Sequence, residues 1–414
     1  MARSPAASVV LASILGGIAT IASTPPGTAA AAAPHPCLAR MPEAAYRSIW
    51  PVKRWSPQRI RAVLETCEAP LKANPTNHRL ILAIAALSYH LGDKARAHAI
   101  LWRADLSATA EGAFLRGEYR FNENKSRADL AAARRWFLRA SELGHARAAV
   151  VLGYYAEGAY LGTQDYKKAL SWYRLAAKRG DGEAHFKIGI FYDAGWGVKR
   201  DRPTALEWYR KASELGVGIA AYHLGEHYRP GMGEKGDPAK AMKWYARAGA
   251  LGYAQALVEL GKMYRRGSAG EKNPDKAREL FRRAAAQGAG EGYYELASEL
   301  EYKHTDARNF DRAVALYFEG AKLGHPESMT RIAMIFEGDT RSYREDVAAA
   351  YFWHTAMWYS GIGTRARVVD DEKLKLFKGY LGAAQFDRIT KMAKAWEPGK
   401  PLPARFAHPP VRER

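Results

Sequence analysis

The sequence predicts an all-α fold, a right-handed solenoid of 36-residue helix pairs, from three series of residues that share one period. Alanines recur from Ala133 to Ala349, and glycines recur from Gly144 to Gly324. Large apolar residues recur at the same spacing, each followed by an aromatic residue: Trp136-Phe137, Trp172-Tyr173, Trp208-Tyr209, Trp244-Tyr245, Leu280-Phe281, Leu316-Tyr317 and Phe352-Trp353. One fixed period of this size indicates a stacked array rather than separate domains.

Polar caps and glycines place the second helix of each copy. A side-chain oxygen that can accept from the first-turn N–H groups stands at the expected start of each helix: Asp129, Asp165, Asp201, Asp237, Asn273 and Asn309. Pro238 and Pro274 follow at the first helical position, where a missing N–H costs nothing. The Gly144 series should end these helices, because glycine accepts the left-handed conformation.

The first helix of each copy carries small residues beside a large apolar one, as in Ala184, Ile188 and Gly189. Small residues let helix axes approach closely, while the large residue fills the groove between them. These positions therefore indicate packing rather than chemistry.

One copy carries most of the signature residues: Ala184, Ile188-Gly189, Tyr192, Gly195-Trp196-Gly197-Val198, Asp201, Ala205, Trp208-Tyr209 and Gly216. This pattern resembles a Sel1-like repeat, a relative of the tetratricopeptide repeat, and seven copies would span residues 111–362. The resemblance implies a helical solenoid that serves as an adaptor in multiprotein assemblies, often in the bacterial envelope. It implies no catalytic residues and no cofactor.

Segments on both sides extend the predicted array. Residues 56–110 resemble divergent tetratricopeptide-like helices, and 363–396 should form amphipathic capping helices. Residues 397–414 are rich in proline and basic residues, which predicts a disordered tail.

The first 33 residues predict a signal peptide, followed by a lead segment over 34–55. Arg3 precedes a mostly apolar stretch from Val9 to Ile21 and a run of alanines. An uncleaved anchor is the alternative, although this stretch is shorter than the ~20 residues that span a bilayer. We therefore expect an exported protein, periplasmic or secreted. Cys37 and Cys67 could then form a disulfide, the alternative being two unpaired thiols.

Lys and Arg number 63 against 43 Asp and Glu, a formal net charge of +20. Second helices carry a predicted basic ridge, defined as Arg139, Lys168, Lys211, Lys240, Arg247, Lys276, Arg283 and Arg312. Such a ridge would attract acidic proteins, anionic envelope glycans or anionic lipid surfaces, or it could simply be a solvated face. No groove-reading helix or stacking platform points to nucleic acid.

Positions that vary between copies mark a second surface. One face of the first helices, opposite the packing residues, mixes aromatic and charged side chains. We call it the first-helix stripe: Arg147, Tyr154, Glu183, Phe186, Lys187, Tyr222, His223, Glu226, Glu259, Lys262, Tyr294 and Glu295. First helices usually line the concave side of such arrays, so the stripe is the predicted partner-binding surface. Phe186 and Tyr222 could instead be core residues between copies.

One motif suggests metal chemistry. His223-Leu224-Gly225-Glu226-His227 fits H-x-x-E-H, and Glu259 could supply a third zinc ligand. Leu224 and Gly225 already belong to the packing pattern, so we expect no metal site.

The sequence thus predicts a non-enzymatic exported scaffold that binds a protein or peptide. The alternative is a factor that binds envelope polysaccharide or peptidoglycan through the basic ridge.

Overall fold

The computed structural model describes residues 56–73, 78–102, 106, 108–122, 126–160, 162–230, 236–270, 272–303, 307–338, 345–359 and 371–410. The predicted signal peptide, the lead segment and Cys37 lie outside these residues. The chain divides into two compact units, Met1–Leu224 (unit 1) and Gly225–Arg414 (unit 2), with the boundary inside one helix. Each unit is described by itself.

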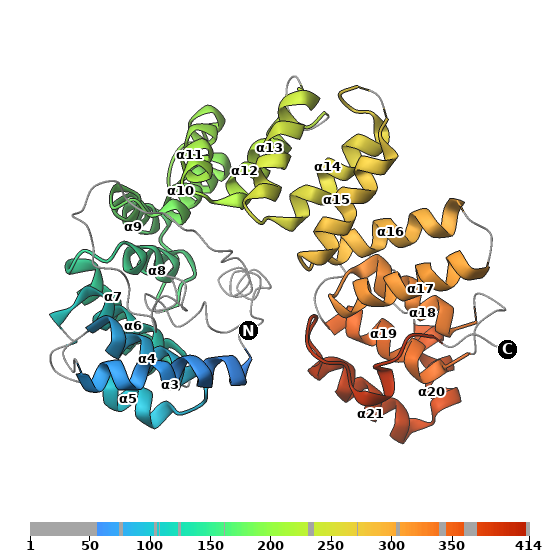
Figure 1. The fold of residues 1–414 in the computed structure, drawn as a ribbon, viewed down its shortest axis with the longest axis horizontal. Coiled ribbons are helices and arrows are strands. Elements are labelled where there is room, and N and C mark those ends of the chain that lie inside the picture. Colours follow the sequence, from blue (N-terminus) through green and yellow to red (C-terminus); the bar gives the residue numbers. More distant parts are fainter. Residues whose placement is uncertain are drawn as a thin grey trace. The chain divides into compact units, whose positions relative to one another are not determined.

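Both units consist of helices that follow one another in antiparallel pairs, and no strand occurs among the residues listed above (Figure 1). The helices up to the boundary are α3 (Pro57–Ala73), α4 (His78–His90), α5 (Lys94–Leu101), α6 (Ala110–Asn122), α7 (Arg127–Glu142), α8 (Ala146–Glu157), α9 (Tyr166–Lys178), α10 (Gly182–Ala194), α11 (Arg202–Glu214) and α12 (Gly218–Tyr228). Those that follow are α13 (Pro238–Ala250), α14 (Ala254–Arg266), α15 (Pro274–Ala286), α16 (Gly290–Lys303), α17 (Ala307–Lys322), α18 (Pro326–Phe336), α19 (Val347–Tyr359), α20 (Asp371–Leu381) and α21 (Ala383–Ala395). None of these described helices has the length and apolar character needed to cross a membrane.

The predicted caps are confirmed at four of six second helices. The side chains of Asp165, Asp201, Asp237 and Asn273 each accept a hydrogen bond from the backbone N–H three residues ahead. The glycines that follow second helices, from Gly144 to Gly324, adopt φ between 83° and 96°, which L side chains rarely adopt.

The other two predicted caps are wrong. Helix α7 begins one turn earlier than expected, because Ser126 caps it and accepts from the N–H of Asp129 at 3.1 Å. Helix α17 begins at Ala307, so Asn309 lies inside its first turn.

The recurring glycine of the first helix touches the recurring aromatic ring of the second. A Cβ added at Gly189 would lie 2.6 Å from the ring of Tyr209, and one at Gly261 would lie 2.6 Å from Phe281. Such a distance is below any ordinary contact, so only glycine lets the ring lie this close to the helix backbone.

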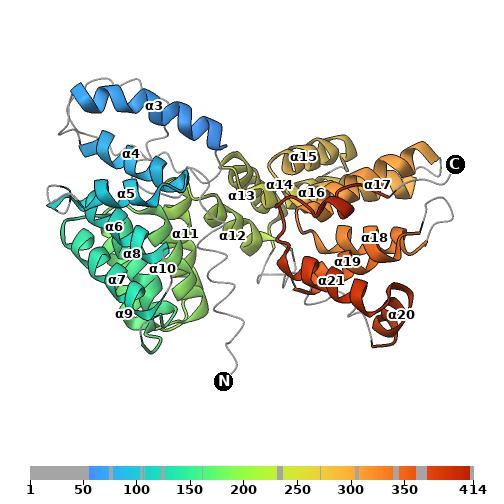
Figure 2. The same cartoon turned by 90° about the horizontal axis from the view of Figure 1, so that it is seen from below.

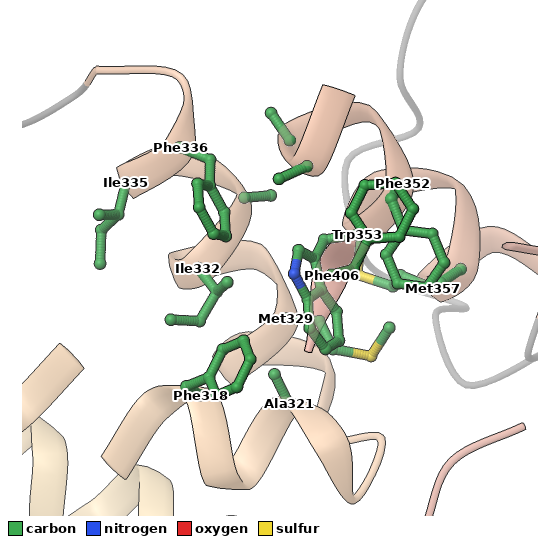
Figure 3. Packing of buried hydrophobic residues seen from close by; sticks show 14 of the residues in the cluster. Phe318, Ala321, Met329, Ile332, Ile335, Phe336, Phe352, Trp353, Met357 and Phe406 are labelled. Carbon is green, nitrogen blue, oxygen red and sulfur yellow. The ribbon is translucent and has the colours of Figure 1, made fainter. Parts of the chain in front are cut away.

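The prediction of a disordered tail from residue 397 is wrong for residues 397–410. Phe406 is 2% exposed and stacks on Phe352 with ring centroids 4.3 Å apart. Figure 3 shows it among Trp353 and Met357. The N–H of Gly399 also donates to the carbonyl of Lys322 at 2.8 Å. Proline and charge suggested disorder, but one buried aromatic ring holds the segment in place.

Helices α20 and α21 close unit 2 beyond α19 (Figure 2). Their apolar residues Phe377, Ile389 and Ala393 belong to the same core cluster as Phe352 and Trp396. The final helix pair therefore covers the apolar face that α19 would otherwise expose.

Candidate partner-binding site

The first-helix stripe lies on α8, α10, α12, α14 and α16. Its twelve side chains are covered rather than open: Tyr154, Phe186 and Glu295 are buried, and the other nine are half-buried. Several of these side chains contact other stripe residues, and others contact residues of the second helices.

Helices α8 and α10, the first helices of two successive copies, are joined by a carboxylate with two donors. Arg147 of α8 forms an ion pair with Glu183 of α10, and the Tyr154 hydroxyl donates to the other oxygen of Glu183. Burial alone would raise the pKa of Glu183, but Arg147 and Tyr154 outweigh burial and lower it. The carboxylate is therefore held in its charged form.

A second carboxylate joins the same two repeats. Glu157 accepts a hydrogen bond from the Tyr173 hydroxyl at 2.5 Å and lies 3.6 Å from Lys187 Nζ. The Lys187 ammonium also lies 4.5 Å from the ring centroid of Tyr154, a cation–π contact. Burial raises the pKa of Tyr173, and the charge of Glu157 adds to that rise, so the hydroxyl remains a donor.

Phe186 packs as a core residue, the alternative considered for it. Its ring centroid lies 5.7 Å from Tyr209 and 5.3 Å from His223, and His223 in turn stacks on Tyr209 at 5.3 Å. This stripe position thus contributes to repeat packing rather than to an open surface.

Two stripe tyrosines keep part of their rings accessible. Tyr222 is half-buried and lies edge-on to His223, with centroids 6.1 Å apart. Tyr294 is half-buried and packs beside Tyr317 and His325, with centroids 5.7 and 5.0 Å away. These rings are the aromatic part of the stripe that a partner could contact.

Unit 2 begins its own charged network on α12 and α14. Glu226 accepts from the Tyr245 hydroxyl and pairs with Arg229 at 3.0 Å. Arg229 also lies 3.7 Å from Glu259, which pairs with Lys262 at 2.9 Å. The charges therefore alternate in sign along the helix pair.

The network continues onto α16. Lys262 pairs with Glu291 and lies 3.8 Å from Glu295, which Arg265 contacts at 2.6 Å. Burial alone would lower the pKa of Lys262, but hydrogen bonds to Glu291 and Glu259 raise it. Lys262 thus stays charged although it is largely covered.

Sequence reasoning missed residues that complete these networks. Four oppositely charged pairs join neighbouring first helices, each with its members 30 residues apart: Glu157–Lys187, Arg229–Glu259, Arg265–Glu295 and Glu301–Arg331. The acid comes first in two of the pairs and the base comes first in the other two, while the spacing stays constant. A search for opposite charges at that spacing could have found all four from the sequence.

The residues of the H-x-x-E-H motif have other contacts. His223 stacks on Tyr209, His227 lies beside Tyr228, and Glu259 faces Arg229 and Lys262. Within the described residues, no three His, Cys, Asp or Glu side chains are grouped as metal ligands.

The predicted basic ridge is exposed in both units, apart from the half-buried Lys276. Several of its members pair with acids on their own helix or at its N-cap: Arg139 with Glu142 at 3.4 Å, Lys240 with Asp237 at 3.0 Å and Lys276 with Glu279 at 2.7 Å. The positive charge available to a partner is therefore smaller than the sequence suggests.

Cys67 is buried among apolar residues of α3 and α4. Cys37 lies outside the described residues, so the Cys37–Cys67 disulfide stays a prediction.

The paired helices, capping residues and glycine–ring contacts define an α-solenoid of two-helix repeats. Six segments match the family model described as Sel1 repeat: residues 110–145, 146–181, 182–217, 218–253, 254–288 and 290–325. These matches cover more than half of the chain, which therefore belongs to the Sel1 repeat family. Members of this family generally bind proteins as non-catalytic scaffolds.

Several solved structures are similar. A Sel1 repeat protein from Oxalobacter formigenes is 26% identical, with 56% of this chain and 96% of that chain covered and a TM-score of 0.46. The protective antigen c5321 of uropathogenic Escherichia coli is 20% identical over 82% and 78%, with a TM-score of 0.40. The immunity protein Pa5087 of Pseudomonas aeruginosa is 22% identical over 62% and 87%, with a TM-score of 0.34. No curated protein matches the chain.

Proposed function

We propose that the protein is an exported, non-enzymatic scaffold that binds a protein or peptide partner through its first-helix stripe. The observation that carries the proposal is a contrast between two sets of residues. The glycines and aromatic rings buried between paired helices are constant, whereas the stripe residues vary. The glycine–ring contacts repeat from copy to copy, whereas stripe residues change and are held by ion pairs between repeats. Side chains fixed before binding lose less conformational entropy when a partner docks.

The charged network formed by the unit 2 stripe residues and their ion-pair partners indicates the chemistry of the partner. In unit 2, carboxylates Glu226, Glu259, Glu291 and Glu295 face the three cations Arg229, Lys262 and Arg265. One carboxylate is in excess, although the whole chain carries a net charge of +20. A partner segment with a basic residue, flanked by apolar side chains that reach Tyr294, fits this surface.

Binding of an anionic envelope glycan through the basic ridge is the second candidate. Exposure of ridge residues such as Lys168 and Lys211 favours it, since a long anionic chain could contact several cations at once. Such binding would be strongly screened by salt, whereas an interface of partly buried groups would not.

The test is recovery of bound material from the exported compartment by tagged protein at low and high salt. The stripe variants are Tyr222→Ala and Tyr294→Ala. The ridge variant combines Lys168→Glu with Lys211→Glu. The control is Tyr302→Ala. Tyr302 is 90% exposed at the end of α16 and lies outside both surfaces. A protein retained at high salt and lost only in the stripe variants supports the proposal. Glycan released by salt and lost only in the ridge variant would overturn it.

A further inference from the structure

Helix α18 begins at a histidine that serves as its cap. The backbone N–H of Ser328 donates to Nδ1 of His325 at 3.3 Å. In α11 and α15 the same bond goes to an oxygen of Asp201 or Asn273. An imidazole nitrogen can accept only while it carries no proton, and imidazole titrates near neutral pH. The cap of α18 therefore exists only in the neutral form of His325.

The repeat does not require histidine at this position. In other copies the corresponding residue is Asp181, which caps α10 at 2.9 Å, or Tyr253, whose side chain makes no capping bond to α14. His145 caps α8 in the same way as His325, accepting from the N–H of Ala148 at 3.2 Å. Packing alone thus does not explain why the cap of α18 is a titratable ring.

The second ring nitrogen also suits the neutral form. Since Nδ1 of His325 accepts, the ring proton lies on Nε2, which faces a carboxylate oxygen of Glu327 at 3.2 Å. The side chain of His325 is only 11% exposed, whereas that of Glu327 is 62% exposed. Water therefore screens the charge of Glu327, and an ion pair with it would offer little to a covered imidazolium.

Other charges reach the ring from α14 and α16. Burial lowers the pKa of His325 below its ordinary 6.5, and this effect outweighs three acids that raise the pKa: Glu327, Glu291 and Glu295. Lys262 of α14 adds to the lowering, and it also pairs with both carboxylates of α16. The acids of α16 are thus largely neutralised before the ring takes up a proton.

Close packing prevents the ring from moving aside. A Cβ added at Gly290 of α16 would lie 2.9 Å from the Cβ of His325, and one at Gly320 of α17 would lie 2.6 Å from Ser328 Oγ. The N–H of His325 also donates to the carbonyl of Gly320 at 3.0 Å. The start of α18 is therefore enclosed by the two preceding helices.

Protonation of the ring would remove the acceptor of a buried donor. A protonated Nδ1 could still donate to Ser328 Oγ, which lies 3.1 Å away, but it could not accept from the backbone. Ser328 is 0% exposed, so its N–H would have no water to replace the lost bond. Opening of the first turn of α18 would relieve this conflict.

Tyr294 links the cap to the first-helix stripe. Its ring packs on the ring of His325 with centroids 5.0 Å apart. Burial raises the pKa of Tyr294, so its hydroxyl stays neutral while the histidine titrates. A change at the cap therefore reaches the stripe by direct contact.

We propose that His325 is a pH-sensitive cap whose protonation opens the first turn of α18 and frees Tyr294, so that the stripe of unit 2 releases its partner in acid. The opening depends only on unit 2, whereas the release rests on the proposed function. Because the folded pKa is lowered, the cap is intact above about pH 6.5 and is lost as pH falls through the folded value.

The first test is hydrogen exchange of the purified chain at pH 7.5 and 5.5, followed by mass spectrometry and corrected for the intrinsic exchange rate. We expect exchange in the first turn of α18 to rise by about threefold or more at pH 5.5. The first turn of α15 is the internal control, because its Asn273 cap does not titrate. Equal changes in the two turns would overturn the proposal.

Two variants separate capping from titration. His325→Asn keeps an accepting side chain that does not titrate, so exchange in α18 should become independent of pH. His325→Ala should exchange quickly at both pH values, and unchanged circular dichroism shows that both variants fold. The same pH dependence in His325→Asn, or ring ¹⁵N spectra with the proton on Nδ1 at pH 7.5, would contradict the proposal.

The second test measures release. The probe is the protein that the tagged chain retains at high salt and pH 7.5, and the bound complex is then washed at pH 5.5. We expect at least about threefold more release from the wild type than from His325→Asn. Equal release would overturn the effect on the stripe. Recovery of no protein at pH 7.5 would instead contradict the proposed function, while the opening of α18 is judged from hydrogen exchange alone.

Discussion

Two junctions between neighbouring repeats, one in each unit, use the same three positions with different chemistry. The positions hold Glu157, Tyr173 and Lys187 in unit 1, and Arg265, Phe281 and Glu295 in unit 2. In unit 1 the carboxylate accepts from the tyrosine hydroxyl and pairs with the lysine. In unit 2 the guanidinium lies 5.4 Å from the phenylalanine ring centroid and pairs with the glutamate.

In these two junctions the ring changes with the charge, whereas the copy with Arg229, Tyr245 and Glu259 keeps a hydroxyl that donates to Glu226 instead. A carboxylate can accept the hydroxyl of Tyr173, whereas a guanidinium has donors only and gains from a bare ring face such as Phe281. Glu301 in unit 2 returns to the first pattern: Tyr317 donates to it at 2.7 Å, and Arg331 pairs with it. The packing of the helices fixes where the three side chains meet. Which residues occupy the positions depends on whether their charges and hydrogen-bonding groups match.

Disrupting the glycine–ring contact that both junctions share should have the largest effect on the free energy of unfolding. Gly153→Val in unit 1 and Gly261→Val in unit 2 would each drive a side chain into the ring of Tyr173 or Phe281. We expect the free energy of unfolding to fall by about 3 kcal/mol in each case, measured by urea denaturation.

The control for this change is Gly162→Val, since a Cβ there would meet nothing within 4 Å. It should alter stability by less than about 0.5 kcal/mol. Equal losses at all three glycines would show that ring contact is not the reason for glycine in the repeat.

Reversing one charge at a junction should have the next largest effect. Glu157→Lys places a cation against Lys187 in a largely buried site, and we expect a loss of about 3 kcal/mol. Adding Lys187→Glu should recover at least half of it, because unit 2 already uses the reversed sign. A double-mutant cycle of denaturation measurements gives the coupling.

The matched control is the pair Lys276 and Glu279 on α15, at 2.7 Å, whose side chains are 42% and 51% exposed. The same reversal there should cost less than about 0.5 kcal/mol, because water screens the pair. Simple additivity in the buried cycle would show that the two charges act independently.

Removing or adding one hydroxyl should have a smaller effect. Tyr173→Phe removes the hydroxyl that donates to Glu157, and Phe281→Tyr places a hydroxyl beside Arg265 in a buried site. We expect each to lower the free energy of unfolding by about 1 to 2 kcal/mol, whereas Tyr302→Phe should be neutral. A stabilised Phe281→Tyr variant would contradict the coupling between ring and charge.

Lowering the pH should reduce the stability of both units by a small and similar amount. The folded pKa values of Glu183 in unit 1 and Glu291 in unit 2 lie below the ordinary 4.5, because bound cations and donors outweigh burial. Their stabilisation is therefore fully present above about pH 5 and is lost as pH falls through the folded pKa values. Thermal unfolding between pH 6 and 3 measures it, and Glu183→Gln should flatten the decline. An unchanged slope in that variant would exclude Glu183 as a contributor.

The period of 36 residues, the glycine ends and four of the six caps followed from the sequence alone. These features are local: a glycine accepts positive φ, and an Asp side chain reaches an N–H three residues ahead, whatever the rest of the chain does. Helical periodicity also placed the twelve stripe residues on the correct helices, because which residues share a face depends only on the helical turn.

Only the tertiary structure decided what those faces do. The spacing put Phe186 on the stripe, but its contacts with Tyr209 and His223 place it in the core. The charges of Glu157 and Lys187 meet because successive first helices pack side by side. The tail shows the same limit, since Phe406 stacks on Phe352 of α19 within the core cluster of unit 2. Burial depends on every element around a residue, and no local pattern contains that information.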